Sequence, residues 1–598
     1  MTTDPQDRRG PRQDHEPADD ELDPGLTVSP LSDFRTDIQI SEIEAEQAEV
    51  AHGAVLRNSS WMAAGSIISR ITGIARDIAL VAALGQYVVA DLFQIGNSLP
   101  DIVYVLILGG ALNAVFVPQL VRRMKDDRDQ GQAYTDSLLS LTGVLLVILT
   151  VVAVLAAPFI VGLYATDEYS AQQTDLAVAF ARLCLPQIFF FGLYTMLAQV
   201  LNARGHFAMP MFAPIFNNIV AVITYSVFAF VVAPEVVAGG DLSTPAILWL
   251  GIGTTLGIVA QSVVLIPVLR RVGYRFHFTR RWRGMGMRKA GRLAGWTIGL
   301  VAVTQIGVIV ATRLTTAANV NAAEAGLPET GFFAFTKAYL IFMIPHGIIT
   351  VSIVTAQLPG LSRMVHDRRS HQAGAEIGRT MRLVSASIVP LALTLFLCSQ
   401  PLSGLLFDIG ANSAEQASEL GVTIGLFMLG LLPFTLYYVL QRGWYAREDT
   451  RTPFLFACLM NVVYVICALW WFPMAPPGGP QVYMVTLAFG AANWVMFIVA
   501  WPTLSRQYTF LDSMSTIWTL ARILFAAGVA LGCMALVLWW LNGGYQVGDS
   551  KLIAIGYLAL TTAVVFAVYL PMAWLVRVQE VRDVLRWIGR ALRAAVRR

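Results

Sequence analysis

Residues 69-SRITGIARD-77 place two arginines and an aspartate inside the first long apolar segment of the chain, at roughly residues 60–84. One charged side chain at the middle of a bilayer costs about 2.5–3.5 kcal/mol on insertion scales. A segment that carries three must therefore turn them toward a bundle interior or a water-filled cavity. Arg70 and Asp77 lie seven residues apart, on one helix face. Because Arg70, Arg76 and Asp77 keep a net positive charge, we expect a cavity that receives anions. The alternative is a structural knot of mutually neutralised charges.

The composition is typical of a polytopic membrane protein. Of the 598 residues, 56% are hydrophobic and 14% charged, and the mean hydropathy is +0.61. We therefore predict an all-α polytopic membrane protein with about 14 transmembrane helices. The fourteen apolar windows of about 20 residues lie at roughly 60–84, 90–121, 136–165, 176–201, 209–233, 246–268, 294–318, 331–360, 382–405, 420–441, 453–472, 483–503, 518–541 and 552–576.

The loops between these windows alternate in charge. Nine bases and no acid lie between Arg270 and Arg292, and further arginines follow in every second loop. The intervening loops are short and neutral or acidic, as in 167-DEYSAQQTD-175. By the positive-inside rule, both termini are expected on the cytoplasmic side, in agreement with an even number of helices.

Both ends of the chain differ from the apolar middle. Residues 1–50 contain fourteen Asp and Glu against four Arg, a net charge of −10, so we predict a disordered acidic cytoplasmic tail over 1–56. Residues 577–598 place apolar side chains at helical spacing among arginines. This basic amphipathic tail is expected to lie on anionic lipid at the cytoplasmic surface, with binding to a partner protein as the alternative.

The chain matches itself at an offset of 243 residues. Ser69-Arg70 corresponds to Thr312-Arg313, and Arg204 and Asn218 correspond to Arg447 and Asn461. The repeat unit holds six helices, so both copies cross the membrane in the same sense. We predict an N-lobe of six helices over 57–293, with a basic cytoplasmic loop at 270–293, and a C-lobe of six helices over 294–505. Two extra helices follow over 506–576. Two parallel-repeat lobes with a site between them are typical of alternating-access transporters.

The ionisable residues inside the apolar windows favour an anionic substrate, because five are basic and three acidic. Arginine binds phosphate through two parallel hydrogen bonds, whereas exporters of cations need acidic cavities. Arg182 and Lys337 also lie near the outer ends of their helices, so snorkelling toward water is an alternative for both. The full set is Arg70, Arg76, Asp77, Asp91, Asp101, Arg182, Arg313 and Lys337.

A membrane-embedded enzyme is the alternative from another class. It would need carboxylates or a metal site on a large loop, but the outer loops run to about a dozen residues and the inner loops lack a His, Cys and Asp cluster. We therefore expect a transporter with no catalytic residues, no metal and no cofactor. The nine-base loop is explained by topology, so we expect no nucleic-acid partner.

Several motifs resemble the lipid II flippases of the MurJ/MviN type, within the multidrug/oligosaccharidyl-lipid/polysaccharide exporter superfamily. The likeness extends over the first twelve helices, and fourteen helices also fit that family. The motifs are Ser69-Arg70-x-x-Gly73-x-x-Arg76-Asp77, Asp91, Leu99-Pro100, Phe116-Val117-Pro118, Leu201-Asn202, Phe207-x-x-Pro210-x-x-x-Pro214-x-x-Asn217 and Tyr445-Ala446-Arg447-Glu448-Asp449-Thr450-Arg451-Thr452-Pro453.

The resemblance implies that lipid II, an undecaprenyl-diphosphate bearing a disaccharide-pentapeptide, is flipped from the inner to the outer leaflet of the bacterial cytoplasmic membrane. It implies that Arg70, Arg76, Asp77 and Asp91 line the central cavity or its gate, and that the last two helices hold the lipid tail. Coupling to the membrane potential or to an ion, and cell-wall synthesis or regulatory proteins bound to the tails, remain open. The competing functions are export of another polyprenyl-linked glycan, drug or cation antiport, and a scaffold role.

Two departures from the family pattern concern cavity charges. Where many members have a pair of arginines after Leu-Pro-Asn, this chain has Asp101-Ile102-Val103, and Gly109 stands where a glutamate is usual. We expect Arg313 and Lys337 to replace the missing positive charge. The expected substrate-binding residues are therefore Ser69, Arg70, Arg76, Arg313 and Lys337, and the expected gate or cavity residues are Asp77 and Asp91.

Overall fold

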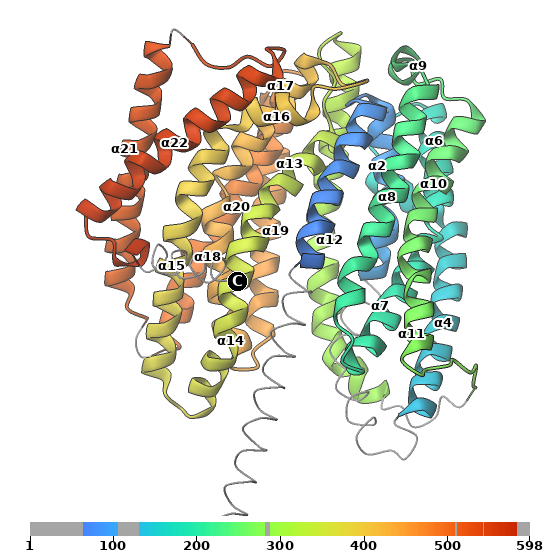
Figure 1. Ribbon diagram of the computed structural model, residues 1–598, viewed down its shortest axis with the longest axis horizontal. Coiled ribbons are helices and arrows are strands. Elements are labelled where there is room, and N and C mark those ends of the chain that lie inside the picture. Colours follow the sequence, from blue (N-terminus) through green and yellow to red (C-terminus); the bar gives the residue numbers. More distant parts are fainter. Residues whose placement is uncertain (1–63, 106–130, 281–286, 509–510, 542, 583–598) are drawn as a thin grey trace, which may run out of the picture. The chain divides into compact units, whose positions relative to one another are not determined.

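The computed structural model describes residues 64–105, 131–280, 287–508, 511–541 and 543–582, apart from the side chains of 287–298. Within these ranges the regular structure is helical, and the first helix covers residues 64–84. The bulk of the predicted tails, 1–56 and 577–598, lies outside the described residues. Figure 1 shows the long helices running side by side in two sets.

The first set contains helix 64–84 and the elements that follow it up to the basic loop. These are α2 (Val88–Tyr104), α4 (Gln132–Leu155), α5 (Ala157–Tyr164), α6 (Ala171–Cys184), α7 (Gln187–Ala203), α8 (Ala208–Val231), α9 (Pro234–Gly239), α10 (Thr244–Val263) and α11 (Leu265–Arg271).

The second set begins with the long helix α12 and ends with two helices beyond the repeat. Its elements are α12 (Met287–Glu324), α13 (Phe332–Pro345), the π-helix η3 (His346–Thr350), α14 (Val351–His366), α15 (Ser370–Leu397), α16 (Ser399–Phe407), α17 (Ala414–Met428), α18 (Leu431–Tyr445), α19 (Arg451–Trp471), η4 (Phe472–Met474), α20 (Gly479–Ser505), α21 (Ser513–Trp540) and α22 (Lys551–Leu575).

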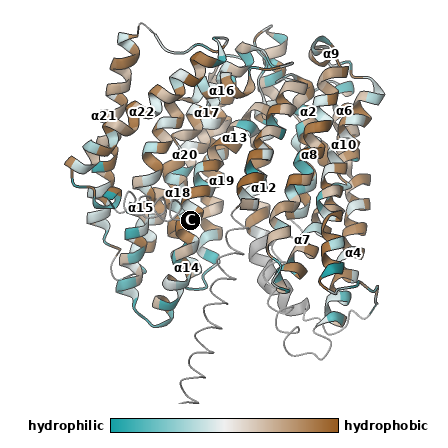
Figure 2. Cartoon of the chain, viewed as in Figure 1, coloured by the Kyte–Doolittle hydropathy of each residue, from teal (hydrophilic) through white to brown (hydrophobic). Residues whose placement is uncertain are grey.

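Eleven described helices are long and apolar enough to cross a membrane, or twelve if the pair α17 and α18, bent by 43°, counts as one span. Helix 64–84 carries three charged residues and α2 has 17 residues, so neither belongs to these eleven. The polytopic helical fold is confirmed, and the count of fourteen stays a prediction. In Figure 2 the hydrophobic residues lie mostly along the middle of the helices, and hydrophilic residues are more frequent toward their ends.

The internal repeat is visible in backbone details at the same offset of 243 residues. Ser170 and Gln173 form a capping box in front of α6, and Ser413 and Gln416 form one in front of α17. Gly205 and Glu448 both have a left-handed backbone, with φ of 80° and 60°. These local features agree with the offset that the sequence shows.

In each repeat, an arginine in the turn between the fourth and fifth helices contacts the segment that follows the sixth helix. The Arg204 guanidinium lies 5.1 Å from the centre of the Tyr274 ring and donates to Val272 O at 3.4 Å. Its repeat mate Arg447 lies 4.3 Å from the Tyr508 ring and donates to Gln507 O at 2.6 Å. The distinctive Tyr445–Pro453 run is therefore a structural corner of the second lobe.

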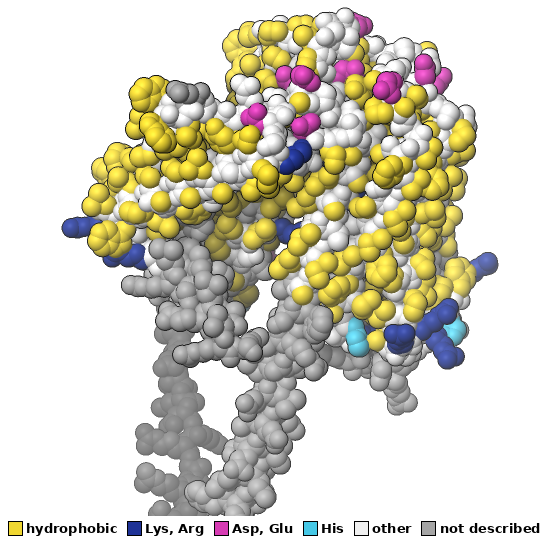
Figure 3. All heavy atoms as spheres, turned by 45° about the horizontal axis from the view of Figure 1, so that its top comes forward, with side chains coloured by type: hydrophobic (Ala, Val, Ile, Leu, Met, Phe, Trp, Pro, Cys, Tyr) yellow, Lys and Arg dark blue, Asp and Glu magenta, His cyan; other side chains and the backbone are white. Residues whose placement is uncertain are grey.

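The described charges separate along the helix axes. In Figure 3, most Asp and Glu side chains gather toward one end of the molecule and most Lys and Arg side chains toward the other. The acidic end holds the loops before α6 and α13, and the basic end holds the turns after α11 and α14. Below we call the acidic end the outer end and the basic end the inner end, as the positive-inside rule predicts.

Candidate functional site

Helix 64–84 is exposed in its first half and enclosed in its second half. Ile67 and Ile71 are 58% and 61% exposed, whereas Leu80 and Leu84 are 2% and 0% exposed. The outer half of this helix is therefore enclosed by its neighbours, whereas these apolar side chains of its inner half stay accessible. Figure 3 shows the surface hollowed between the two sets of helices, away from the acidic end.

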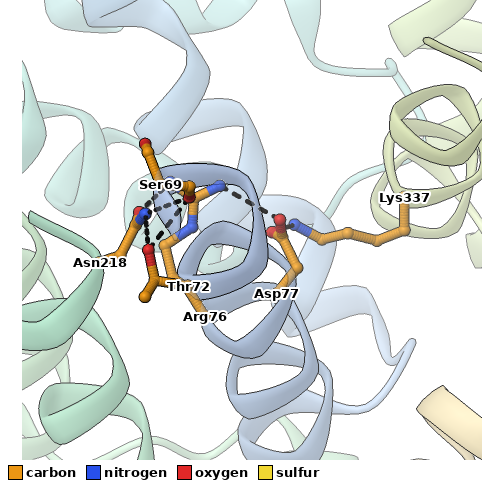
Figure 4. Close-up of polar contacts among 6 residues, drawn as sticks. All are labelled: Ser69, Thr72, Arg76, Asp77, Asn218 and Lys337. Carbon is orange, nitrogen blue, oxygen red and sulfur yellow. Dashed lines mark hydrogen bonds and ion pairs between the residues drawn. The ribbon is translucent and has the colours of Figure 1, made fainter. Parts of the chain in front are cut away.

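Asp77 joins the two lobes at the middle of this helix. Its Oδ2 accepts a hydrogen bond from Arg76 at 3.1 Å, and its Oδ1 accepts one from Lys337 Nζ of α13 at 2.7 Å. The Asp77 and Lys337 side chains are 5% and 7% exposed, whereas Arg76 keeps 31% of its side chain exposed. Figure 4 shows Arg76 and Lys337 approaching Asp77 from opposite sides.

Lys337 therefore does not snorkel to the outer surface. Its ammonium group lies 4.9 Å from the centre of the Phe333 ring, inside the protein. Two cations share one carboxylate, so Arg76, Asp77 and Lys337 together carry a net charge of +1. Asp77 thus lies between the lobes, and its role as a cavity or gate residue stays a prediction.

Asn218 of α8 orients the Arg76 side chain and was not singled out as a site residue by the sequence. Its Nδ2 donates to Ser69 O at 3.0 Å and to Thr72 Oγ1 at 2.9 Å, and its Oδ1 accepts from Arg76 at 3.4 Å (Figure 4). The sequence feature that could have identified Asn218 is its counterpart in the internal repeat, Asn461. A Cβ at Gly307 would clash with the Asn461 side chain, so Asn461 packs closely on α12.

Arg70 is exposed and lies one turn or more further toward the inner end. A Cβ placed on Gly347 would lie 3.3 Å from both terminal nitrogens of Arg70. The guanidinium therefore lies against the backbone of the π-helix in the opposite lobe. Single-turn π-helices are frequent at functional sites. Counting Arg70, the cluster has a net charge of +2.

Asp91 and Glu329 close the outer end by a reciprocal contact. Asp91, in the first turn of α2, accepts from Phe333 N at the start of α13 at 2.6 Å and from Asn319 Nδ2 at 2.9 Å. Glu329, just before α13, accepts from Val88 N at the start of α2 at 2.8 Å. Each carboxylate thus satisfies the free N–H groups of the other lobe's helix, where a negative charge is favourable.

Further hydrogen bonds reinforce this closed end. Gln86 Nε2 donates to Asn412 Oδ1 at 3.0 Å and to Gln416 O at 2.7 Å. Ala411 N donates to Ala82 O at 2.8 Å. Burial raises the pKa of the Glu329 carboxyl to about 7, although the Val88 hydrogen bond acts in the opposite direction. The outer closure therefore contains a group that titrates near neutral pH.

Arg313 lies apart from the cluster around Asp77. It donates to Asp167 Oδ2 at 2.5 Å and to Gly162 O at 3.1 Å, at the outer end of the first lobe. It thus also links α12 to the opposite lobe in this conformation, and its role toward substrate stays a prediction. No group of three or more His, Cys, Asp or Glu within the described residues could hold a metal ion.

The chain is similar to known proteins over most of its length. The chain is 26% identical to a probable lipid II flippase MurJ of Rhizobium meliloti over 524 residues, 86% of this chain and 93% of that protein. It is also 26% identical to the lipid II flippase MurJ of Burkholderia cenocepacia, covering 78% of this chain and 87% of that protein.

Solved structures share the fold. An inward closed conformation of the lipid II flippase MurJ matches with a TM-score of 0.62 and 18% identity, over 85% of this chain and 98% of that one. An inward-facing multidrug transporter of the MATE family matches with a TM-score of 0.54 and 15% identity, over 75% and 96%. The model of the family "Lipid II flippase MurJ" matches residues 80–556. The chain therefore belongs to the lipid II flippase MurJ family.

Proposed function

We propose that this protein flips lipid II from the inner to the outer leaflet by alternating access of two lobes, 57–293 and 294–505. Both termini lie in the cytoplasm in this proposal. The observation that carries it is the cationic cluster of Arg70, Arg76 and Lys337 around the single carboxylate of Asp77, at the junction of lobes that are closed at one end. Family membership names the substrate, and the cluster gives its diphosphate a place to bind.

The diphosphate meets the exposed cations first. Arg70 and the exposed part of Arg76 offer planar guanidinium groups, which bind phosphate oxygens through two parallel hydrogen bonds. Ser69 precedes Arg70 on the same helix and adds a hydroxyl donor. Because Lys337 is already bound to Asp77, an arriving anion competes with that carboxylate for it. Substrate binding would thereby weaken a contact that joins the lobes.

Opening of the outer end then requires the links at that end to break. Asp91 has to leave the start of α13, Glu329 the start of α2, and Arg313 has to leave Asp167. Arg313 is then free to meet the head group on its way out. The polyprenyl tail stays in lipid along α21 and α22. An inside-negative potential of about 100 mV supplies about 2.3 kcal/mol for each negative charge that crosses fully.

Reconstitution tests this proposal without the rest of the cell. Proteoliposomes containing the full chain are loaded with lipid II, and a head-group probe added outside reports its appearance in the outer leaflet. We expect flipping by the wild type and a loss of at least tenfold in Arg70→Ala. If lipid II stays in place while another polyprenyl-linked glycan or an organic cation is moved, the proposed substrate is wrong.

A further inference from the structure

One face of α2 presents polar side chains inside the membrane-spanning part of the first lobe. Gln94, Ser98 and Asp101 follow one another at spacings of four and three residues, which places them on a single helix face. Gln94 Nε2 donates to Ser98 Oγ at 2.9 Å. Gln94 Oε1 is buried and has no hydrogen-bond partner in the described part of the chain. The face therefore holds an acceptor that nothing described in the protein satisfies.

Asp101 ends this polar face as an exposed carboxylate. None of the described residues forms a hydrogen bond or ion pair with it. A carboxylate that faced hydrocarbon would cost about 2.5–3.5 kcal/mol on insertion scales. Asp91, on the same face of α2, contacts Asn319 and Phe333 of the opposite lobe. We therefore infer that the exposed side of Asp101 faces the space between the lobes.

Asp101 and Arg70 lie at the same depth in this space. Helix 64–84 and α2 are joined by the turn at 85–87 and run in opposite directions. At a rise of 1.5 Å per residue, Arg70 and Asp101 both lie about 20 Å from that turn. The wall of the cavity thus carries an exposed cation and an exposed anion at one level. A site built only for a diphosphate would gain nothing from the carboxylate, because it repels phosphate oxygens.

We propose that Asp101 is a specificity-determining residue that binds a cationic amine on the peptide of the substrate head group. The inference rests on the proposed function. A lipid-linked disaccharide-pentapeptide carries a diphosphate near the lipid and, where its peptide includes a diamino acid, a free ammonium group further out. Arg70 and Arg76 bind the anionic end, and the exposed carboxylate of Asp101 binds the ammonium group. The cavity thereby selects a head group that carries both charges.

The test compares two forms of one lipid. The full chain in nanodiscs is titrated with lipid II that has a lysine-containing peptide, and with the same lipid after acetylation of its free amine. Acetylation removes the positive charge and leaves the diphosphate, the sugars and the tail unchanged. We expect the wild type to bind the free amine about tenfold more tightly, the factor that one charge-assisted hydrogen bond supplies.

Variants assign the preference to one residue. Asp101→Asn is expected to reduce the ratio of the two affinities to about one, and Asp101→Glu to keep most of it. Asp241→Asn removes a carboxylate from the exposed loop before α10 and is expected to keep the wild-type ratio. A wild type that binds both lipids equally, or an Asp101→Asn variant that keeps the preference, would overturn the inference.

The same lipids distinguish this inference from the function beneath it. If neither form binds or is flipped in proteoliposomes, the proposed function itself fails. If both bind equally and both are flipped, the function stands and Asp101 only balances the charge of the cavity, so the inference is wrong.

Discussion

Asp91 and Glu329 form reciprocal contacts across the two lobes. The carboxylate of Asp91, in α2, lies at the N-terminus of α13, and the carboxylate of Glu329, just before α13, lies at the N-terminus of α2. Asp91 Oδ1 accepts a hydrogen bond from Phe333 N at 2.6 Å, and Glu329 Oε2 accepts one from Val88 N at 2.8 Å. Because α2 and α13 are repeat-related, the outer closure is nearly symmetric. Both contacts must break together for the outer end to open.

The outer closure is expected to depend on pH through Glu329. Burial raises the pKa of its carboxyl to about 7, whereas in an open, solvated state it returns toward its ordinary value near 4.5. The closed state therefore binds the proton more tightly. Protonation of Glu329 therefore stabilises the closed state at low pH, and this stabilisation is lost as the pH rises through about 7. Spin labels at exposed outer positions 241 and 415 measure the closed fraction by pulsed EPR.

Glu329→Gln serves as the control for this pH dependence. It keeps an acceptor for Val88 N but does not titrate, so its closed fraction should vary less with pH between about 5 and 8 than that of the wild type. Asp91 lies in the same closure and can contribute to the slope of both proteins. An equal slope in both proteins would show that Glu329 is not the titrating group.

Breaking the buried pair between Asp77 and Lys337 is expected to be costly. Both side chains are less than 10% exposed, and removing one partner of such a pair costs about 3–5 kcal/mol because the other charge is left uncompensated. Asp77→Asn leaves the buried Lys337 ammonium group without a carboxylate and should therefore lower the thermal unfolding midpoint in detergent strongly. Lys337→Met should lower it less, because Arg76 still pairs with Asp77. The double variant Asp77→Asn with Lys337→Met should recover most of that loss without recovering transport. A single variant as stable as the wild type would contradict this reading.

Arg313 is expected to serve the substrate after release from Asp167. Arg313→Ala should then abolish complementation of a depleted strain about as fully as Arg70→Ala does. Asp167→Asn, which removes only the outer partner, should complement. The reverse pattern, with Arg313→Ala fully active, would reduce Arg313 to a surface contact.

Glu448 is expected to be a strained position in the second lobe. Its φ of 60° lies in the left-handed region, which costs a non-glycine residue about 1–2 kcal/mol. The repeat mate at this corner is Gly205, which adopts the region freely. Glu448→Gly should therefore raise the free energy of unfolding by about 1 kcal/mol with transport unchanged, and Gly205→Ala should lower it. Thermal unfolding of both variants in detergent checks the sign.

The helices and the repeat could be predicted from the sequence because both depend on local patterns. Apolar windows mark the spans, and residues such as Arg204 and Arg447 recur at one offset. The positions at which single apolar windows break into two helices were harder to predict from the sequence. The window 176–201 is continuous in apolarity, yet the structure divides it into α6 and α7 near Pro186. Bends of this kind depend on packing between helices rather than on hydropathy.

The site was predictable where its residues share one helix. Arg70, Arg76 and Asp77 lie within eight residues of one apolar helix, so membrane energetics alone predicts that they face away from lipid. Lys337 is 260 residues from Asp77 in the chain, and no local pattern distinguishes its pairing from snorkelling. Glu329 likewise reads as an ordinary loop acid until the fold places it at the start of α2.

The most direct test of the central claim is depletion of this protein in its own cell, followed by a leaflet-resolved assay of lipid II. We expect lipid II to accumulate in the inner leaflet, with rescue by the wild type and none by Arg70→Ala expressed at the same level. An unchanged distribution of lipid II, together with loss of another surface glycan, would contradict the account and identify a different lipid-linked substrate.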